Sequence, residues 1–333
     1  MSQSHDTETA MLTLPTVGFG TMTLGDQVDQ QGSMQLLDIA LEHGATLIDT
    51  ANSYNAGRSE RIVGQWIRSR GARDEIVLAT KVRYGVGDEP GSEGLAPDVV
   101  VAQVDASLRR LDVDYVDILY LHQPDDDVPL DITWECLHRI VNAGKVRHIG
   151  VSNFAAWQIA GASHSAERHS WPPPAVVQPM YNAIAQGAAA ELWPMTRAYG
   201  IATCIYNPLA GGLLTAKHAA ADSPTAGTRL ARSETYRQRY WHPRQREAAA
   251  RLAEAATQSG RSPTELALRF VLDDPNVDCV LLGATGPAQL QESLRVVAAP
   301  MLSAAERDRC DEVWRWLQGP IPRYYRTNDR ATA

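Results

Sequence analysis

The stretch Val116-Asp117-Ile118-Leu119-Tyr120-Leu121-His122 decides the fold, because it is a short apolar run that leads directly into a histidine. Two other apolar runs also end on an ionisable residue, Asp49 in one and Lys81 in the other. Runs of this length are typical of strands buried in a parallel sheet. Polar groups at the carboxyl ends of successive parallel strands are how a (β/α)8 barrel builds its active site. The three runs therefore predict a barrel with one site at its strand ends, and Tyr54 would lie in a loop beside them.

Strand-like and helix-like segments alternate along the whole chain. Eight predicted strands separated by helices favour a parallel sheet closed into a (β/α)8 TIM barrel, with an open doubly wound sheet as the alternative. Residues 211–245 have little apolar periodicity and are predicted to be a long insertion after the seventh strand, of the kind that forms functional loops or is disordered. Residues 1–10 are expected to be a flexible tail, and residues 11–333 a single barrel domain ending in an extra helix and a tail. The strands are predicted at 17–20, 45–49, 76–81, 115–121, 145–151, 176–178, 201–206 and 277–282, and the helices at 34–43, 59–70, 97–111, 130–143, from about 155, 188–199, 246–259, 263–273, 287–297 and 303–317.

The composition bounds the class of protein. Of the 333 residues, 44% are hydrophobic and 21% are charged, which is ordinary for a globular protein with one large core. A net charge of −8 disfavours nucleic acid or an anionic membrane as a partner. The chain has no apolar run long enough to span a membrane and no signal-like N-terminus, so a cytoplasmic protein is expected. The four cysteines are widely spaced, without a C-x-x-C pair or a zinc-like cluster, which predicts free thiols and no metal site.

The segment Gly18-Phe19-Gly20-Thr21-Met22-Thr23 begins like the glycine-rich fingerprint of a dinucleotide-binding Rossmann domain. It lacks the third glycine, and no helix follows it directly. Asp49 lies at about the right distance to hold a ribose, but without that glycine the match is weak. A Rossmann domain is therefore disfavoured.

Asp49, Tyr54, Lys81 and His122 make chemical sense as a set. Tyr54 could donate a proton, and a nearby Lys81 ammonium would lower the phenol pKa from its ordinary value of about 10. Asp49 could hold Lys81, and His122 could orient a carbonyl. Each residue alone also has a structural explanation, since an aspartate at a strand end is usually a cap, a tyrosine usually packs, and a histidine there is often a satisfied core residue.

Six motifs, in the family's order, resemble the aldo-keto reductase superfamily, and the similarity runs from about Gly18 to Arg326. Within it, the chain looks most like the branch of aflatoxin-aldehyde and succinic-semialdehyde reductases. The family motifs are Thr50-Ala51-Asn52-Ser53-Tyr54, Ala79-Thr80-Lys81, Tyr120-Leu121-His122-Gln123-Pro124-Asp125, Gly150-Val151-Ser152-Asn153-Phe154, Val177-Gln178-Pro179-Met180-Tyr181-Asn182 and Tyr206-Asn207-Pro208-Leu209. The branch rests on Asn207-Pro208-Leu209-Ala210-Gly211-Gly212-Leu213-Leu214, Ser233-Glu234-Thr235-Tyr236-Arg237 and Pro322-Arg323-Tyr324-Tyr325-Arg326.

The resemblance implies hydride transfer between NADPH and an aldehyde or ketone, with NAD not excluded. Tyr54 would be the general acid, assisted by Lys81, Asp49 and His122. The resemblance also implies which residues bind the cofactor, NADP. Around the nicotinamide half they are Gly20, Thr21 and Met22 beneath it, Asp49 beside the ribose, Ser152, Asn153 and Gln178 at the nicotinamide amide, and Tyr206 stacked on the nicotinamide ring. The others are Asn207, Pro208, Leu209, Gly211 and Gly212 in the next loop, Lys217 and Arg229 at the phosphates, and Gly283, Thr285, Gln289, Glu292 and Ser293 at the adenosine end.

The adenosine end departs from part of the family. Many members carry basic residues that grip the 2′-phosphate, at places where this chain has Gly283 and Gln289, although some NADPH-using branches also have glutamine there. The usual acid–asparagine ending is Glu292-Ser293 here. Residues 217–246 carry seven basic and two acidic side chains, a net charge of +5. This stretch would either compensate for the missing basic pair or be a solvated surface.

The residues implied to contact the substrate are Tyr84, Trp241, Arg237, Tyr325 and Arg326. Arg237 and Arg326 match the branch's candidates for a substrate carboxylate, which the arginine fork pairs bidentately. The expected partner is a small-molecule carbonyl compound. A homo-oligomer is compatible with the sequence, which does not fix the oligomeric state.

Three alternatives stay open. A cofactor-binding regulatory subunit would act through a protein partner, as do channel-associated β-subunits that resemble this family. A barrel lyase or dehydratase would use Lys81 as a Schiff base. A dedicated biosynthetic ketoreductase would apply the same hydride chemistry to a sugar or polyketide.

Overall fold

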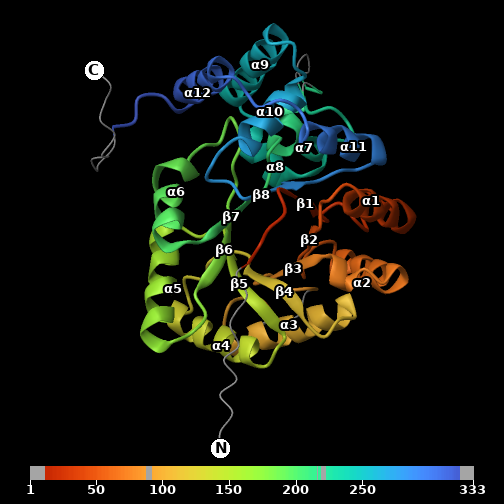
Figure 1. Ribbon diagram of the computed structural model, residues 1–333, viewed down its shortest axis with the longest axis vertical. Helices are drawn as coiled ribbons and strands as arrows, with labels where there is room; N and C mark the ends of the chain where they lie inside the picture. Colours follow the sequence, from red (N-terminus) through yellow and green to blue (C-terminus); the bar gives the residue numbers. More distant parts are fainter. Residues whose placement is uncertain (1–11, 88–91, 216, 219–222, 323–333) are drawn as a thin grey trace, which may run out of the picture.

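Eight parallel strands close into a barrel in the order of the chain in this computed structural model, which describes residues 12–87, 92–215, 217–218 and 223–322 (Figure 1). β8 closes the barrel against β1, where Val17 is paired with Val280. The predicted (β/α)8 barrel is therefore confirmed, and the open doubly wound sheet is excluded. The strands are β1 (Val17–Gly20), β2 (Leu47–Asp49), β3 (Val77–Val82), β4 (Val116–Leu121), β5 (Val146–Ser152), β6 (Pro174–Gln178), β7 (Ala202–Ile205) and β8 (Cys279–Leu282).

Helices surround the barrel (Figure 1). The first helix begins at Gln30, earlier than the predicted start at Met34, because the side chain of Asp29 caps it by accepting a hydrogen bond from Gly32 N at 2.8 Å. The first turn is polar, so apolar periodicity could not reveal it. The helices outside the insertion are α1 (Gln30–Glu42), α2 (Arg58–Arg70), α3 (Pro97–Leu111), α4 (Leu130–Asn142), α5 (Ala156–His169), α6 (Ala188–Tyr199), α9 (Pro243–Gln258), α10 (Pro263–Leu272), α11 (Pro287–Val296) and α12 (Ala304–Gln318), with a short 3-10 turn η1 (Arg73–Glu75).

The insertion predicted after β7 is present, but it is not devoid of secondary structure. It contains η2 (Ala210–Thr215), α7 (Arg229–Arg232) and α8 (Glu234–Tyr240). Within α7 and α8 only Leu230, Tyr236 and Tyr240 are buried. Three buried positions on two short helices are too few to produce a visible apolar period. The described residues from Ala210 to Tyr240, without 216 and 219–222, are called the rim below.

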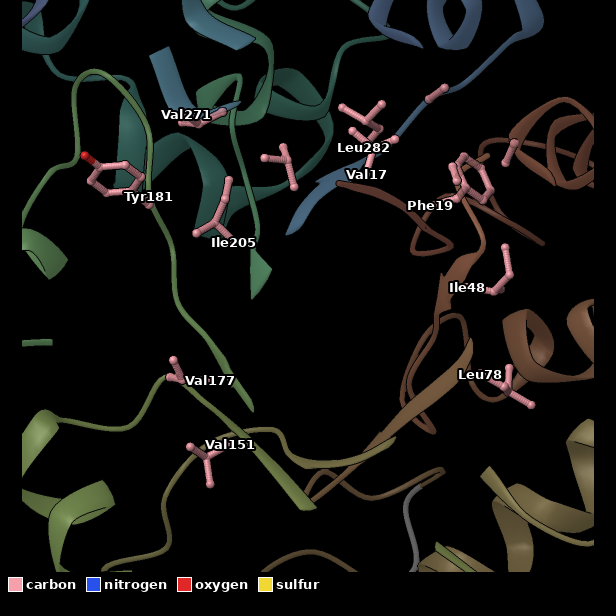
Figure 2. Packing of buried hydrophobic residues seen from close by; sticks show 14 of the residues in the cluster. Val17, Phe19, Ile48, Leu78, Val151, Val177, Tyr181, Ile205, Val271 and Leu282 are labelled. Carbon is pink, nitrogen blue, oxygen red and sulfur yellow. The ribbon is translucent and has the colours of Figure 1, made fainter. Parts of the chain in front are cut away.

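Side chains alternate between the inside and the outside of the barrel along each strand. Leu47 points into the interior, whereas its neighbour Ile48 packs against the surrounding helices. Figure 2 shows the outward set, with Ile48, Leu78 and Val177 on different strands. The inward set fills the barrel beneath the strand ends, so a packed floor supports the site. This barrel floor consists of Leu47, Ala79, Ile118, Tyr120, Val176, Cys204, Cys279 and Leu281.

The four cysteines are free, as predicted, and the structure shows that all four are buried. Cys204 and Cys279 are register partners on β7 and β8 within the barrel floor, where a thiol packs as a small apolar group. Among the described residues, no helix is long and apolar enough to cross a bilayer.

Candidate active site

A cavity of about 920 Å³ lies at the carboxyl ends of the barrel strands, and loops from all eight strands contribute to its wall. This volume is in the range of cofactor and ligand pockets. The predicted site residues that line it are Gly20, Met22, Asp49, Tyr54, Tyr84, His122, Ser152, Asn153, Gln178, Tyr206, Asn207, Pro208, Leu209, Gly211, Gly212, Lys217, Arg229, Gly283, Thr285, Gln289 and Ser293.

A buried ion pair lies under the cavity. Lys81 Nζ donates hydrogen bonds to Asp49 Oδ1 and, at 2.9 Å, to the carbonyl oxygen of Thr50. The other carboxylate oxygen, Asp49 Oδ2, accepts from Gln178 Nε2 at 2.8 Å. Burial opposes the charged form of Lys81, but the charges of Asp49 and Tyr54 outweigh it, so the pKa of the lysine is raised. The pair therefore holds a fixed ammonium below Tyr54.

Tyr54 lies in the tight turn after β2. Asn55, whose φ is 53°, pins this turn by donating from Nδ2 to the carbonyl oxygens of Met22 and Leu24 at 3.0 and 2.6 Å. Lys81 Nζ is 5.0 Å from the centroid of the Tyr54 ring. The turn thus brings the phenol and the ammonium together, as expected from the sequence.

The pKa of Tyr54 corrects one expectation. Burial raises the pKa of this phenol, and the neighbouring Lys81 lowers it by a smaller amount, so the net shift is upward. The predicted lowering is therefore wrong in its net direction. A raised pKa keeps Tyr54 protonated at neutral pH, which is the state that a proton donor needs.

His122 directly follows β4 and is half-buried on the cavity wall. Burial lowers the pKa of its imidazole to about 3, and the charge of Lys81 adds to this effect. Its ring meets the ring of Tyr54 edge-on at 5.9 Å and 78°. Within the described part of the chain, His122 Nδ1 has no hydrogen-bond partner. The side chain is therefore a neutral imidazole next to the phenol at any ordinary pH.

Three further predicted residues are joined by hydrogen bonds at the ends of β5 to β7. Asn153 Nδ2 donates to the carbonyl oxygen of His122 at 2.9 Å, and Tyr206 Oη donates to Asn153 Oδ1 at 2.6 Å. Ser152 Oγ donates to the carbonyl oxygen of Gln178 at 2.8 Å. Asn153 adopts the left-handed φ of 61° that this arrangement requires. Through Asn153, the backbone of His122 is therefore linked to the side chain of Tyr206.

The loop after β7 has consecutive residues with positive φ, Ala210 at 49°, Gly211 at 67° and Gly212 at 98°. A Cβ on Gly211 would lie 2.8 Å from Tyr236 Cδ1, so glycine lets this tyrosine pack against the loop. The Arg229 guanidinium lies over the Tyr236 ring, 5.1 Å from the ring centroid. Gly211, Gly212 and Arg229 all line the cavity, so this part of its wall carries a positive charge that an anion could use.

The end of the cavity near α11 is uncharged. Gln289 Oε1 accepts from Thr285 N at 3.0 Å and from Thr285 Oγ1 at 3.1 Å. Ser293 lines the cavity here, whereas Glu292 does not. The cations on the cavity wall instead come from the rim: Lys217, Arg229 and Arg239.

Several predicted residues do not line the cavity. Thr21 is buried and donates to the carbonyl oxygen of Asp49 at 3.0 Å, so it braces the strand ends. Trp241 packs edge-on against His218 at 5.5 Å. Arg237 pairs with Glu234 at 2.7 Å on the surface. Tyr325, Arg326 and the tail at residues 1–10 lie outside the described residues.

Other residues of the cavity wall were not predicted. Arg239 is the most consequential, because it brings a guanidinium to the wall near Tyr206. Helical periodicity could not have found it: Tyr236 and Tyr240 are the buried residues of α8, and Arg237 and Arg239 lie at equal angles on either side of that buried face. The further wall residues are Thr23, Gln27, Ser53, Asn55, Gln123, Thr215, His218, Ala226, Gly227, Thr228, Thr235, Tyr236, Leu281, Leu282 and Ala284.

Comparison with known proteins agrees with this geometry. The model of the Aldo/keto reductase family matches residues 16–315. The chain is 35% identical to aflatoxin B1 aldehyde reductase member 2 of Homo sapiens, over 92% of this chain and 88% of that protein. It is 34% identical to a probable voltage-gated potassium channel subunit beta of Arabidopsis thaliana, over 91% of this chain and 93% of that protein. It is also 33% identical to aldo-keto reductase YhdN of Bacillus subtilis (strain 168), over 88% of each chain.

These similarities confirm the family inferred from the six motifs, and they agree with the aflatoxin-aldehyde branch. They extend across the barrel and both sides of the cavity. The chain therefore belongs to the aldo/keto reductase family and is an NAD(P)H-dependent oxidoreductase.

Proposed function

We propose that this chain reduces an aldehyde or ketone with NADPH and that Tyr54 is the general acid. The observation that carries the proposal is the buried Lys81–Asp49 pair, with its ammonium 5.0 Å from the Tyr54 ring and the neutral His122 edge-on to the same ring. A set of this kind has little use in a purely structural site, because a buried ion pair is costly to desolvate.

The bound nicotinamide supplies the hydride. As the hydride reaches the carbonyl carbon, negative charge develops on the oxygen, and Tyr54 transfers its proton to that oxygen. The raised pKa of Tyr54 does not prevent this step, because an alkoxide is a much stronger base than a phenolate. Lys81 stabilises the phenolate that remains, and Asp49 keeps Lys81 charged. His122, being neutral, orients the substrate oxygen by hydrogen bonding without adding a charge.

The donor set of the cavity fits a dinucleotide. Asn207 Nδ2 is buried without a partner among the described residues, and it lies beside the positive-φ loop and Arg229. Tyr206 offers an aromatic face for the nicotinamide, and the Thr285–Gln289 turn offers the start of α11 for the adenosine end. NADPH is favoured over NADH because Lys217 and Arg229 bring positive charge to a cavity whose end near α11 is uncharged.

The substrate is proposed to carry a negative group. Arg239 lies on the cavity wall near Tyr206, where its charge acts to lower the pKa of that phenol against the larger upward effect of burial. Arg237, which the sequence favoured for this role, points to the surface and pairs with Glu234. Arg239 therefore replaces Arg237 as the proposed partner of a substrate carboxylate. The name of the human relative, an aldehyde reductase, agrees with a carbonyl substrate.

The Schiff-base alternative is disfavoured by the state of Lys81. A nucleophilic amine must be neutral and exposed to its substrate, but this amine is fully buried, its pKa is raised, and it is bound to Asp49 and Thr50. A regulatory subunit is the second candidate, and the relative named a potassium channel subunit beta favours it. The complete set of four residues favours the enzyme.

Substitution of Tyr54→Phe separates these functions. NADPH oxidation would be followed by absorbance, with 4-nitrobenzaldehyde and succinic semialdehyde as acceptors and NADH in parallel. We expect turnover to fall by roughly 10²–10⁴ while cofactor binding, measured by tryptophan fluorescence, stays near wild type. Comparable turnover in the mutant would show that Tyr54 is not the proton donor. A wild-type protein that binds NADPH tightly but reduces neither acceptor would support the regulatory role.

A further inference from the structure

Tyr84 connects two consecutive residues of the cavity wall. Its ring meets the ring of His122 edge-on at 5.1 Å and 74°, and its hydroxyl donates a hydrogen bond to Gln123 Oε1. All three side chains line the cavity. The Gln123 amide is therefore held beside the imidazole that, in the proposed function, receives the reacting carbonyl oxygen.

Tyr84 is itself fixed. Asn52 Nδ2 donates to the carbonyl oxygen of Tyr84 at 2.8 Å. The preceding residue, Arg83, is anchored through its backbone N–H to Gln103 Oε1 at 2.8 Å, and its guanidinium lies 5.2 Å from the centroid of the Tyr84 ring. The loop after β3 thus presents the tyrosine in one orientation, and the orientation of the Gln123 amide follows from it.

The Gln123 amide has one end engaged and one end free. Oε1 accepts from Tyr84, and within the described ranges this is the one hydrogen bond of the Gln123 side chain. Because Gln123 lines the cavity, its amide N–H groups are available to a ligand bound there. Because the Tyr84 ring contacts His122 and the Tyr84 hydroxyl donates to Gln123, this donor lies close to His122. An oxygen on the carbon next to the reacting carbonyl would lie within its reach.

We propose that Gln123, positioned by Tyr84, is a specificity-determining residue that selects carbonyl substrates with an oxygen on the adjacent carbon, such as a hydroxyl or a second carbonyl. The proposal rests on the proposed reductase function. A bound substrate without that oxygen covers the amide N–H groups without pairing them, which disfavours its transition state.

The test compares 2-hydroxypropanal with propanal, which differ by the single α-hydroxyl group. The readout is the ratio of the two kcat/KM values for NADPH oxidation in one protein sample, because the folded fraction cancels in this ratio. We expect Gln123→Leu to lower the ratio about three- to tenfold, the loss that corresponds to one neutral hydrogen bond. Tyr84→Phe should lower it less, and the double variant should match Gln123→Leu, because Tyr84 acts through Gln123.

The matched control is Gln65→Leu. Gln65 Oε1 also accepts a side-chain hydrogen bond, from Gln30 at 2.7 Å, but on the outer surface of α2, so the ratio should stay at its wild-type value. An unchanged ratio in Gln123→Leu would overturn the proposal. An equal loss on both substrates would also overturn it, because Gln123 would then only support His122. If the wild type oxidised NADPH with neither substrate, nor with the acceptors used above, the reductase function itself would fail.

Discussion

The barrel floor and the rim reach the same cavity by different physical routes. The floor supports Asp49 and Lys81 through side chains that alternate along paired strands, and its Tyr120 ring lies 5.8 Å below Lys81 Nζ. The rim brings Arg229 and Arg239 to the cavity on short helices held by few buried side chains. The floor therefore fixes the charges that the chemistry needs, and the rim supplies charges that select what binds.

The largest effect is expected from Lys81→Met, which tests whether the floor fixes the charges that the chemistry needs. Loss of the ammonium leaves Asp49 buried without its partner, so the free energy of unfolding should fall by about 3–5 kcal/mol. Reduction should fall by roughly 10²–10⁴ because Tyr54 loses the charge that stabilises its phenolate. Urea unfolding and NADPH oxidation measure the two effects.

The matched control for stability is Lys145→Met. Lys145 pairs with Asp105 at 2.6 Å, but the two side chains are 38% and 35% exposed, so the loss should stay below about 1 kcal/mol. If both variants lost the same free energy of unfolding, the buried pair above the floor would contribute no more to stability than the half-exposed pair.

A pair of glycine substitutions tests the two regions with the same chemical change. A Cβ on Gly150 would lie 2.5 Å from Tyr120 Cδ1 inside the floor, so Gly150→Ala should destabilise the fold by about 1–3 kcal/mol or more. Gly211→Ala should cost about 1 kcal/mol for its φ of 67° and displace Tyr236, which would raise the KM for NADPH. Thermal unfolding and KM measurements on both variants decide the matter, and the opposite ranking of stability losses would contradict the comparison.

Most of the floor could be predicted from the sequence, because buried strands carry an unbroken apolar signal and end on the residues that matter. Asp49, Lys81 and His122 were found in this way. The rim could not be predicted equally well. Arg239 and Arg237 are both basic and only two residues apart, and the choice between them depends on the face of α8, whose two buried tyrosines give too weak a signal. The net direction of the Tyr54 pKa also escaped prediction, since burial depends on the whole surrounding structure.

The rim can be tested by Arg239→Met beside Arg237→Met. If Arg239 pairs with a substrate carboxylate, its loss should lower kcat/KM for succinic semialdehyde about ten- to a hundredfold, the range of a hydrogen bond to a charged group. The effect on 4-nitrobenzaldehyde, which has no carboxylate, should be small. Arg237→Met should change neither value, because Arg237 pairs with Glu234 outside the cavity. The assignment is wrong if Arg237→Met has the larger effect.

The smallest expected effect is the pH dependence of reduction. Reduction needs Tyr54 protonated, and the pKa of Tyr54 is raised above its ordinary value of 10.0, so the donor loses its proton only in strongly alkaline solution. It also needs His122 neutral, and its pKa of about 3 means that the imidazole gains a proton only in strong acid. With both groups in the required state between these limits, kcat/KM for reduction should be flat from about pH 5 to pH 9, without an inflection near the ordinary histidine value.

Oxidation of the alcohol needs the phenolate instead, so its rate should rise about tenfold per pH unit across the same range. A reduction profile that bends near pH 6.5 would mean that the floor does not exclude water from His122. Tyr54 and His122 would then exchange protons with the solvent as exposed side chains do.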